Sequence, residues 1–121
     1  MKKSNIKLLI FFFVAMSILS CEKNKITDEE LYEESLESGY QYYKNSPDTL
    51  TPASASPHGI FRVRFNTVAQ KSLDATGKLP ESSSFEEDAV IVKEVYAQKG
   101  GPLTILVIMK KVSKSKNARS A

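Results

Sequence analysis

Lys93 is the titratable side chain in this chain with the most unusual sequence neighbours. If the residues around it form a strand, Lys93 points the same way as Ile91, Val95 and Ala97. A lysine in such an apolar row either lies at a sheet edge, where its ammonium group reaches water, or lines a pocket that lowers its pKa. The pattern alone favours the edge, and a binding or catalytic pocket at Lys93 is the alternative.

Two other cationic or titratable side chains lie earlier in the chain. Arg62 and Arg64 share the less apolar side of an expected strand. Arginines in such a position are usually solvated or form an ion pair, here with Glu94 or Glu86. His58 lies in a proline-bounded loop and could be a ligand, a base or an ordinary loop residue, and the last is the commonest case. No nucleophile triad, phosphate-binding loop or paired-carboxylate hydrolase pattern is evident.

The composition excludes several classes of site. The 121 residues hold one cysteine and one histidine, so a metal site built from several histidines of one chain is excluded. The net charge of +3 comes from Lys2, Lys3 and Lys7, because the remaining basic residues equal the 14 acidic ones in number. The part after the first 21 residues is therefore neutral, and no nucleic-acid partner is expected.

The N-terminus has the design of a signal peptide. Three lysines precede a short apolar run over residues 8–19, which ends in Leu19-Ser20-Cys21. This ending resembles the lipobox of bacterial lipoproteins, which implies cleavage between Ser20 and Cys21 and acylation (palmitate included) of the Cys21 thiol. The alternatives are a plain signal peptide or an uncleaved anchor. The resemblance implies a protein held on the cell envelope by lipid, with the outer membrane favoured, facing the periplasm or the surface.

The first expected element is a helix from Thr27 to about Lys44. Thr27 and Glu30 form a capping box, and acidic residues in the first turn favour the positive end of the helix dipole. An apolar stripe at three- or four-residue spacing is predicted to pack in the core: Tyr32, Leu36, Tyr40 and Tyr43. A second, shorter helix is expected from a cap at Asn66 or Thr67 to about residue 75, with Gly77 as its stop.

Three strands are expected. Residues 60–65 alternate, with three apolar side chains on one face and Ile60, Arg62 and Arg64 on the other. Residues 89–97 and 103–112 are joined by the short Lys99–Pro102 connection, which predicts an antiparallel hairpin. Because residues 103–109 are almost continuously apolar, they are predicted to form a central strand covered on both faces.

The fold class is therefore α+β: a small antiparallel β-sheet packed with an N-terminal helix and a short second helix. We expect a signal peptide over residues 1–20, a lipid-anchored tether over 21–26, one domain over 27–112 and a basic, disordered tail over 113–121. The domain is expected to be incomplete at its C-terminus. Residues 103–109, predicted as a central strand, would otherwise be left at a sheet edge, where a long apolar strand is an aggregation liability.

A series of motifs runs in order through residues 56–109: Ser56-Pro57-His58-Gly59, Phe61-Arg62-Val63-Arg64-Phe65-Asn66, a helix containing Ala69, and Ala89-Val90-Ile91-Val92-Lys93-Glu94. Together they resemble the cytochrome P-460 family, including its exported, lipobox-bearing members. The resemblance implies a small β-rich domain with flanking helices, often dimeric, so a homodimer is an open expectation. The best-known members bind a c-type haem and oxidise hydroxylamine or bind small ligands such as nitric oxide.

The resemblance also gives Lys93 and Arg62 possible roles. Lys93 matches the strand lysine that is joined covalently to the haem in the hydroxylamine-oxidising members, which implies a pocket position. Arg62 falls near the position of a strand arginine that lies close to the haem in those members. The alignment of the two sequences at this position is left open. The family attaches haem through a Cys-x-x-Cys-His motif, which the 121 residues lack, so covalent haem c cannot form on them. His58 could coordinate iron weakly but could not replace that set.

Three hypotheses follow. The first is a lipoprotein with a shortened cytochrome P-460-like domain and no catalytic activity of its own. The second is a haem-free lipoprotein that binds a small ligand on the Lys93 side or a partner at the hairpin edge. The third, least favoured, is a haem-dependent hydroxylamine or nitric oxide redox protein. No metal site and no resident cofactor are expected.

Overall fold

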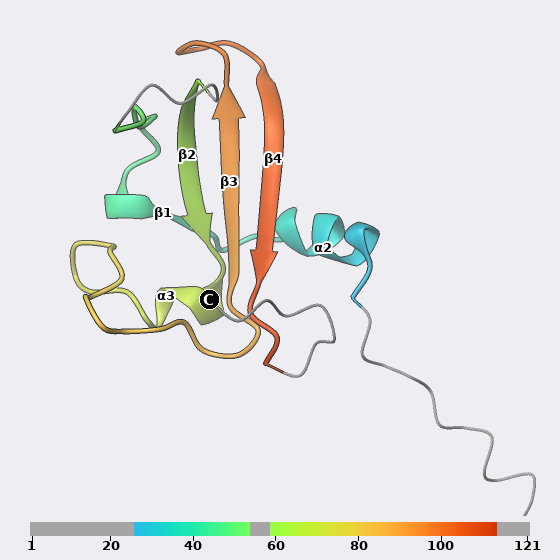
Figure 1. The fold of residues 1–121 in the computed structure, drawn as a ribbon, viewed down its shortest axis with the longest axis vertical. Helices are drawn as coiled ribbons and strands as arrows, with labels where there is room; N and C mark the ends of the chain where they lie inside the picture. The colour runs from blue at the N-terminus through green and yellow to red at the C-terminus, as the bar shows by residue number, and fades with distance from the viewer. Residues whose placement is uncertain (1–25, 54–58, 114–121) are drawn as a thin grey trace, which may run out of the picture.

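The computed structural model describes residues 26–53 and 59–113. Within them, a four-stranded antiparallel sheet in the order β1-β2-β3-β4 is accompanied by two α-helices, α2 and α3 (Figure 1). The predicted α+β class is therefore confirmed. The predicted signal peptide, the predicted lipidation site Cys21, His58 and residues 114–121 of the predicted tail lie outside the described residues.

The first helix, α2 (Asp28–Ser35), begins with the predicted capping box. The Thr27 hydroxyl accepts a hydrogen bond from the Glu30 amide at 3.2 Å, and the Glu30 carboxylate accepts one from the Thr27 amide at 2.8 Å. The prediction that this helix continues to Lys44 is wrong. The chain turns at Gly39, whose φ of +89° favours glycine, and then pairs with the sheet instead of extending the helix.

The predicted apolar stripe is also wrong, because its four residues do not share one helix. Tyr32 is 48% exposed and Leu36 is 57% exposed. Tyr40 and Tyr43 lie beyond α2, on either side of β1 (Gln41–Tyr42), and Tyr43 begins the short 3-10 helix η2 (Tyr43–Asn45). The backbone pairing of β1 with β2 therefore replaces the helical hydrogen bonds that the spacing predicted.

The two strands β2 (Ile60–Phe65) and β3 (Val90–Tyr96) carry the candidate site residues. Val63 pairs with Lys93, and Arg62 pairs with Glu94. Paired residues of antiparallel strands point to the same face, and neighbours along a strand point to opposite faces. The predicted alternation over residues 60–65 is therefore confirmed.

The second helix, α3 (Thr67–Gln70), is shorter than predicted. Its cap is Asn66, whose side chain accepts hydrogen bonds from the amides of Ala69 at 2.9 Å and Val90 at 3.0 Å. Gly77 does not end this helix. Instead, its φ of +75° lets it close a separate turn, in which its amide donates to the Asp74 carbonyl at 2.9 Å.

The last strand, β4 (Leu103–Lys110), forms the predicted hairpin with β3. The prediction that this strand is central is wrong. In the described residues β4 is the last strand of the sheet, and Ile105, Val107 and Met109 are 42%, 39% and 51% exposed. A continuous apolar run does not distinguish burial on two faces from an edge strand with one face open.

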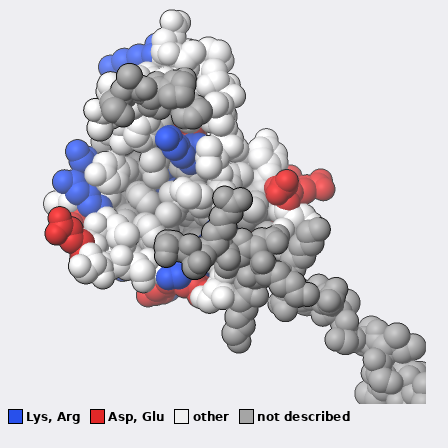
Figure 2. Space-filling model, in the orientation of Figure 1, with Lys and Arg blue, Asp and Glu red and all other residues white. Residues whose placement is uncertain are grey.

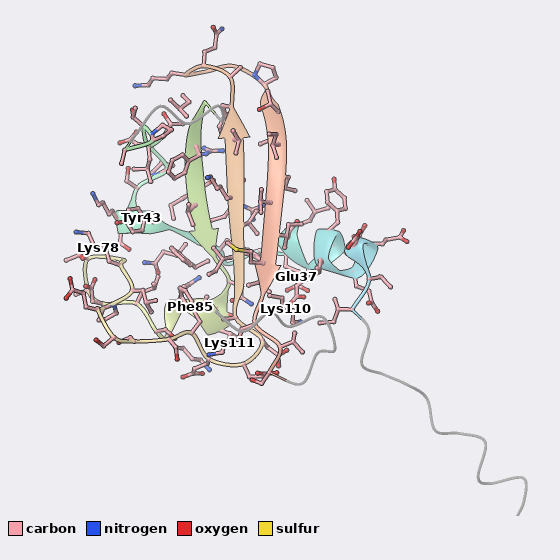
Figure 3. All side chains as sticks on the ribbon, in the orientation of Figure 1. Glu37, Tyr43, Lys78, Phe85, Lys110 and Lys111 are labelled. Carbon is pink, nitrogen blue, oxygen red and sulfur yellow. The ribbon has the colours of Figure 1, made fainter. Side chains whose placement is uncertain are left out.

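The buried core lies where β2 meets α3 and the loop that follows it. Phe65, Ala69 and Ala89 are at most 5% exposed. The Phe85 ring from the loop stacks on Phe65 with a centroid separation of 5.8 Å. Figure 3 shows Phe85 and Tyr43 at this end of the sheet, and both pack against the buried core residues. This packing holds two loops against β2 and shapes the face beside Lys93.

Candidate functional site

One face of the sheet, which we call the Lys93 face, is apolar except for Lys93. The register places Phe61, Val63 and Phe65 from β2 beside Ile91, Lys93 and Val95 from β3, and β4 continues the row. The side chains that β4 adds are apolar as well: Ile105, Val107 and Met109. Lys93 therefore lies in the middle of an otherwise uncharged surface. The expectation that it lies at a sheet edge is wrong, because β3 pairs with β2 on one side and with β4 on the other.

An open groove of about 500 Å³ lies on the β2 side of this face. Its walls come from β2 and from the chain segments that pack beside it, and they are mostly aromatic or aliphatic, including Tyr43, Leu50, Phe61, Val63, Phe65 and Phe85. Concave surfaces with apolar walls and few polar groups are typical of small-ligand sites. The groove is open to solvent and not an enclosed cavity.

The Lys93 ammonium group lies over a ring that lines this groove. Its nitrogen is 4.4 Å from the centroid of the Phe61 ring, which lines the groove. This is cation–π geometry. Among the described residues, no carboxylate forms an ion pair with Lys93 and no acceptor forms a hydrogen bond with it. Lys93 is thus a cation with an aromatic neighbour but without a counter-charge in that part of the chain.

The opposite face, which we call the Glu94 face, holds a charged network. The Glu94 carboxylate accepts hydrogen bonds from Arg62 Nε at 3.0 Å, Arg64 Nε at 2.8 Å and the Tyr96 hydroxyl at 2.9 Å. Glu94 is only 9% exposed. The Arg62 guanidinium group also lies between the rings of Tyr42 and Tyr96, at 5.1 Å and 5.2 Å from their centroids.

The protonation states of this network follow from its contacts. Burial alone would raise the pKa of Glu94, but the hydrogen bonds from Tyr96 and Arg62 outweigh it and hold the pKa below its usual value. Burial raises the pKa of Tyr96, and the Glu94 carboxylate raises it further. Burial would lower the pKa of Arg62, but Glu94 reverses this and raises it. At neutral pH the network is therefore an ionised carboxylate held by two guanidinium groups.

The same network holds α2 on the Glu94 face. Arg64 donates a hydrogen bond to the Ser35 carbonyl at 2.8 Å, and the Tyr40 hydroxyl donates one to the Glu34 carbonyl at 3.0 Å. At the end of β4, Lys110 Nζ lies 2.9 Å from a Glu34 carboxylate oxygen. Figure 3 shows Lys110 beside the C-terminal part of α2, and Figure 2 shows acidic side chains over that helix.

The structure separates two residues that the sequence placed together. Lys93 and Arg62 were both considered for one pocket, but the register puts them on opposite faces of the sheet. Arg62 instead forms the expected ion pair with Glu94, at 2.7 Å. His58 and Cys21 lie outside the described residues, so their surroundings are not described.

Sequence reasoning missed the aromatic side chains on both sides of the sheet. Phe61 was assigned to an apolar face but not to the groove rim, and Tyr42 was assigned to a helix. Both contacts are diagonal across paired strands, because Lys93 pairs with Val63 and Tyr42 pairs with Arg64. The register between strands creates them, so no spacing within one segment could have predicted them. The groove itself has no sequence signal, because its walls come from segments far apart in the chain.

The residues present do not fit the haem c that the resemblance implies. The sequence has no Cys-x-x-Cys-His motif, and Cys21 is its single cysteine. Residues 26–53 and 59–113 contain no group of three or more His, Cys, Asp or Glu side chains that could hold a metal ion. No step of haem chemistry is therefore assigned to these residues.

Comparison of the chain with protein-family models, curated proteins and solved structures finds no match. In the parts of the chain that the structure describes, none of the helices has both the length and the apolar character needed to cross a membrane.

Proposed function

We propose that this chain is an exported lipoprotein with a cytochrome P-460-like sheet domain, which binds a small apolar anion on its Lys93 face without attaching haem. One observation carries the proposal. The Lys93 ammonium group lies over Phe61, which lines an apolar groove of about 500 Å³, and it has no carboxylate partner among the described residues. A ligand with an apolar body and a negative group would match both parts of this surface.

The energetic argument concerns the unpaired charge. Lys93 is partly buried among apolar side chains and has no carboxylate partner among the described residues, so an anionic ligand would supply the counter-charge. A hydrogen bond to a charged group contributes about 1.5–3 kcal/mol, which corresponds to roughly tenfold or more in affinity. The groove would supply the remaining binding energy through burial of the ligand's apolar body.

The lipoprotein part of the proposal rests on the sequence around Cys21. A basic segment, a short apolar run and Leu19-Ser20-Cys21 supply the three parts of a lipoprotein signal. Acylation would hold the domain at the surface of the cell envelope, with the outer membrane favoured. The domain would then act as a binding module that uses Lys93 and the groove lined by Phe61.

A dye pair tests the ligand class. The full chain is reconstituted in lipid nanodiscs and titrated with 8-anilinonaphthalene-1-sulfonate and with N-phenyl-1-naphthylamine, an uncharged analogue of similar shape, with empty nanodiscs as the blank. We expect Lys93→Met to weaken sulfonate binding about tenfold and to leave the neutral dye unaffected. Lys99→Met, which removes an exposed lysine in the hairpin connection, is the matched control. Equal sulfonate affinity in the wild type and Lys93→Met would reject the proposed ligand class.

A labelling experiment tests the anchor separately. Cells that express the wild type or Cys21→Ser are grown with an alkyne-labelled palmitate and then fractionated. We expect the label only on the wild type, because Cys21→Ser lacks the thiol that would be acylated. Label retained by Cys21→Ser would contradict acylation at this residue, whatever the dye titration shows.

A further inference from the structure

The exposed apolar side chains of this protein gather on two elements that contact each other. In residues 26–53 and 59–113 the large exposed hydrophobic side chains belong to α2 with its cap or to β4: Tyr32, Leu36, Leu103, Ile105, Val107 and Met109. The two elements meet where Lys110 pairs with Glu34. The exposed β4 side chains Ile105, Val107 and Met109 lie on the Lys93 face, whereas α2 lies on the Glu94 face. Apolar side chains are therefore exposed on both faces next to the edge of β4.

The outer edge of β4 also offers unpaired backbone groups. The Lys111 amide donates to the Ala89 carbonyl at 2.9 Å, so the backbone N–H of Lys111 points toward the β3 side of the sheet. Peptide groups of an antiparallel strand alternate in direction, so those of Val107 and Met109 also point to β3. The peptide groups of Leu106 and Ile108 consequently point outward, where β4 has no neighbouring strand among the described residues.

This edge lacks the features that usually prevent strand addition. From Leu103 to Met109 there is no charged residue and no proline. The register shift in the hairpin lies at its far end, opposite Val95 and Tyr96. The nearby helix α2 is attached to side chains of the Glu94 face, through Arg64 and Lys110, and not to the outward peptide groups of β4.

We propose that the outer edge of β4 is the site where a second copy of this chain adds, antiparallel, to form one continuous sheet across a two-fold axis. The sequence of β4 complements itself in this arrangement. With Val107 opposite Val107 of the second copy, Ile105 faces Met109, and the Lys93 faces of both copies lie on the same side. The single charge of the strand, Lys110, falls opposite Thr104, so no like charges face each other.

The helix α2 extends this interface. Figure 1 shows α2 reaching past β4, away from β3. Since its contacts place it on the Glu94 face, the projecting part would lie over the β4 strand of the second copy. Tyr32 and Leu36, at 48% and 57% exposure, would then have a surface to pack against. The pairing would thus give Tyr32 and Leu36 a surface to pack on, and it would give Ile105, Val107 and Met109 lateral contacts with the same side chains of the second copy.

Single-cysteine variants of the full chain test the register. In this pairing the two Val107 residues form a non-hydrogen-bonded pair with Cα atoms about 4.5 Å apart, close enough for a disulfide. We expect Val107→Cys to cross-link rapidly under mild oxidation. Ile105→Cys alone and Met109→Cys alone should not, because identical residues there lie about 14 Å apart. Co-expression of these last two variants should give the mixed cross-link.

The wild type, whose single cysteine is Cys21, is the control for cross-links at the anchor. Val107→Lys supplies a second measurement, because a charge at the centre of the edge should prevent pairing. We expect this variant to elute at half the protein mass of the wild type in detergent while its circular dichroism is unchanged. A monomeric wild type, or equal cross-linking at residues 105, 107 and 109, would overturn the proposal.

Discussion

Lys93 and Glu94 are neighbours in β3 and lie in opposite electrostatic environments. The Glu94 carboxylate is held by two arginines and a tyrosine on one face of the sheet, while the Lys93 ammonium group lies over the Phe61 ring on the other. The charges of the two residues therefore have different uses. Glu94 is paired within the fold, whereas Lys93 has no counter-charge among the described residues.

Replacing Lys93 with methionine should leave the free energy of unfolding unchanged or increase it. Methionine keeps most of the apolar stem and removes an unpaired charge from an apolar face. Urea denaturation of the wild type and Lys93→Met measures the difference. A loss of more than about 2 kcal/mol would show that the charge is paired and structural, as expected for a broken buried ion pair.

Replacing Glu94 with glutamine should destabilise the fold by about 2–3 kcal/mol, because Arg62 and Arg64 keep their partly buried positions and lose their counter-charge. The same denaturation experiment measures the change. Glu81→Gln, which alters an exposed loop carboxylate, is the matched control and should lie within about 0.5 kcal/mol of the wild type. Equal effects of the two variants would show that the network contributes little to stability.

The pKa of Glu94, which is lowered in the folded protein, predicts acid sensitivity. A carboxyl group with a depressed folded pKa contributes stability at pH values above its unfolded pKa of about 4.3. That contribution is lost as the pH falls through the folded pKa. Unfolding free energies measured between neutral pH and about pH 3 should therefore decline below about pH 4.5. The decline should be shallower for Glu94→Gln, and identical profiles would contradict the assignment.

Two glycines with the same backbone conformation should differ in their tolerance of alanine. Gly77 and Gly100 both have a φ of +75°. A Cβ atom on Gly77 would lie 2.9 Å from the Asn45 backbone nitrogen, whereas on Gly100 it would meet nothing within 4 Å. Gly100→Ala should cost about 1 kcal/mol for the conformation alone, and Gly77→Ala should cost about 1–3 kcal/mol more. Thermal unfolding measures both, and similar losses would mean that the turn relaxes without strain.

Much of the fold could be predicted from local patterns. The capping box at Thr27 and Glu30, the alternation over residues 60–65 and the hairpin connection before Leu103 depend on neighbours in sequence, and all three are present. The α2 helix was predicted too long because its continuation competes with a non-local alternative. The pairing of β1 with β2 joins segments that are far apart in the chain, so the periodicity of one segment cannot predict it.

The sequence by itself determined which side chains are charged, which alternate, and that Cys21 follows an apolar run typical of a lipoprotein signal. It also determined that Arg62 and Lys93 lie on strands. Only the tertiary structure decided that these two cations face opposite ways, because the register between strands sets which residues share a face. It likewise decided that β4 lies at the edge of the described sheet, since exposure depends on what packs against a strand and not on the apolar residues within it.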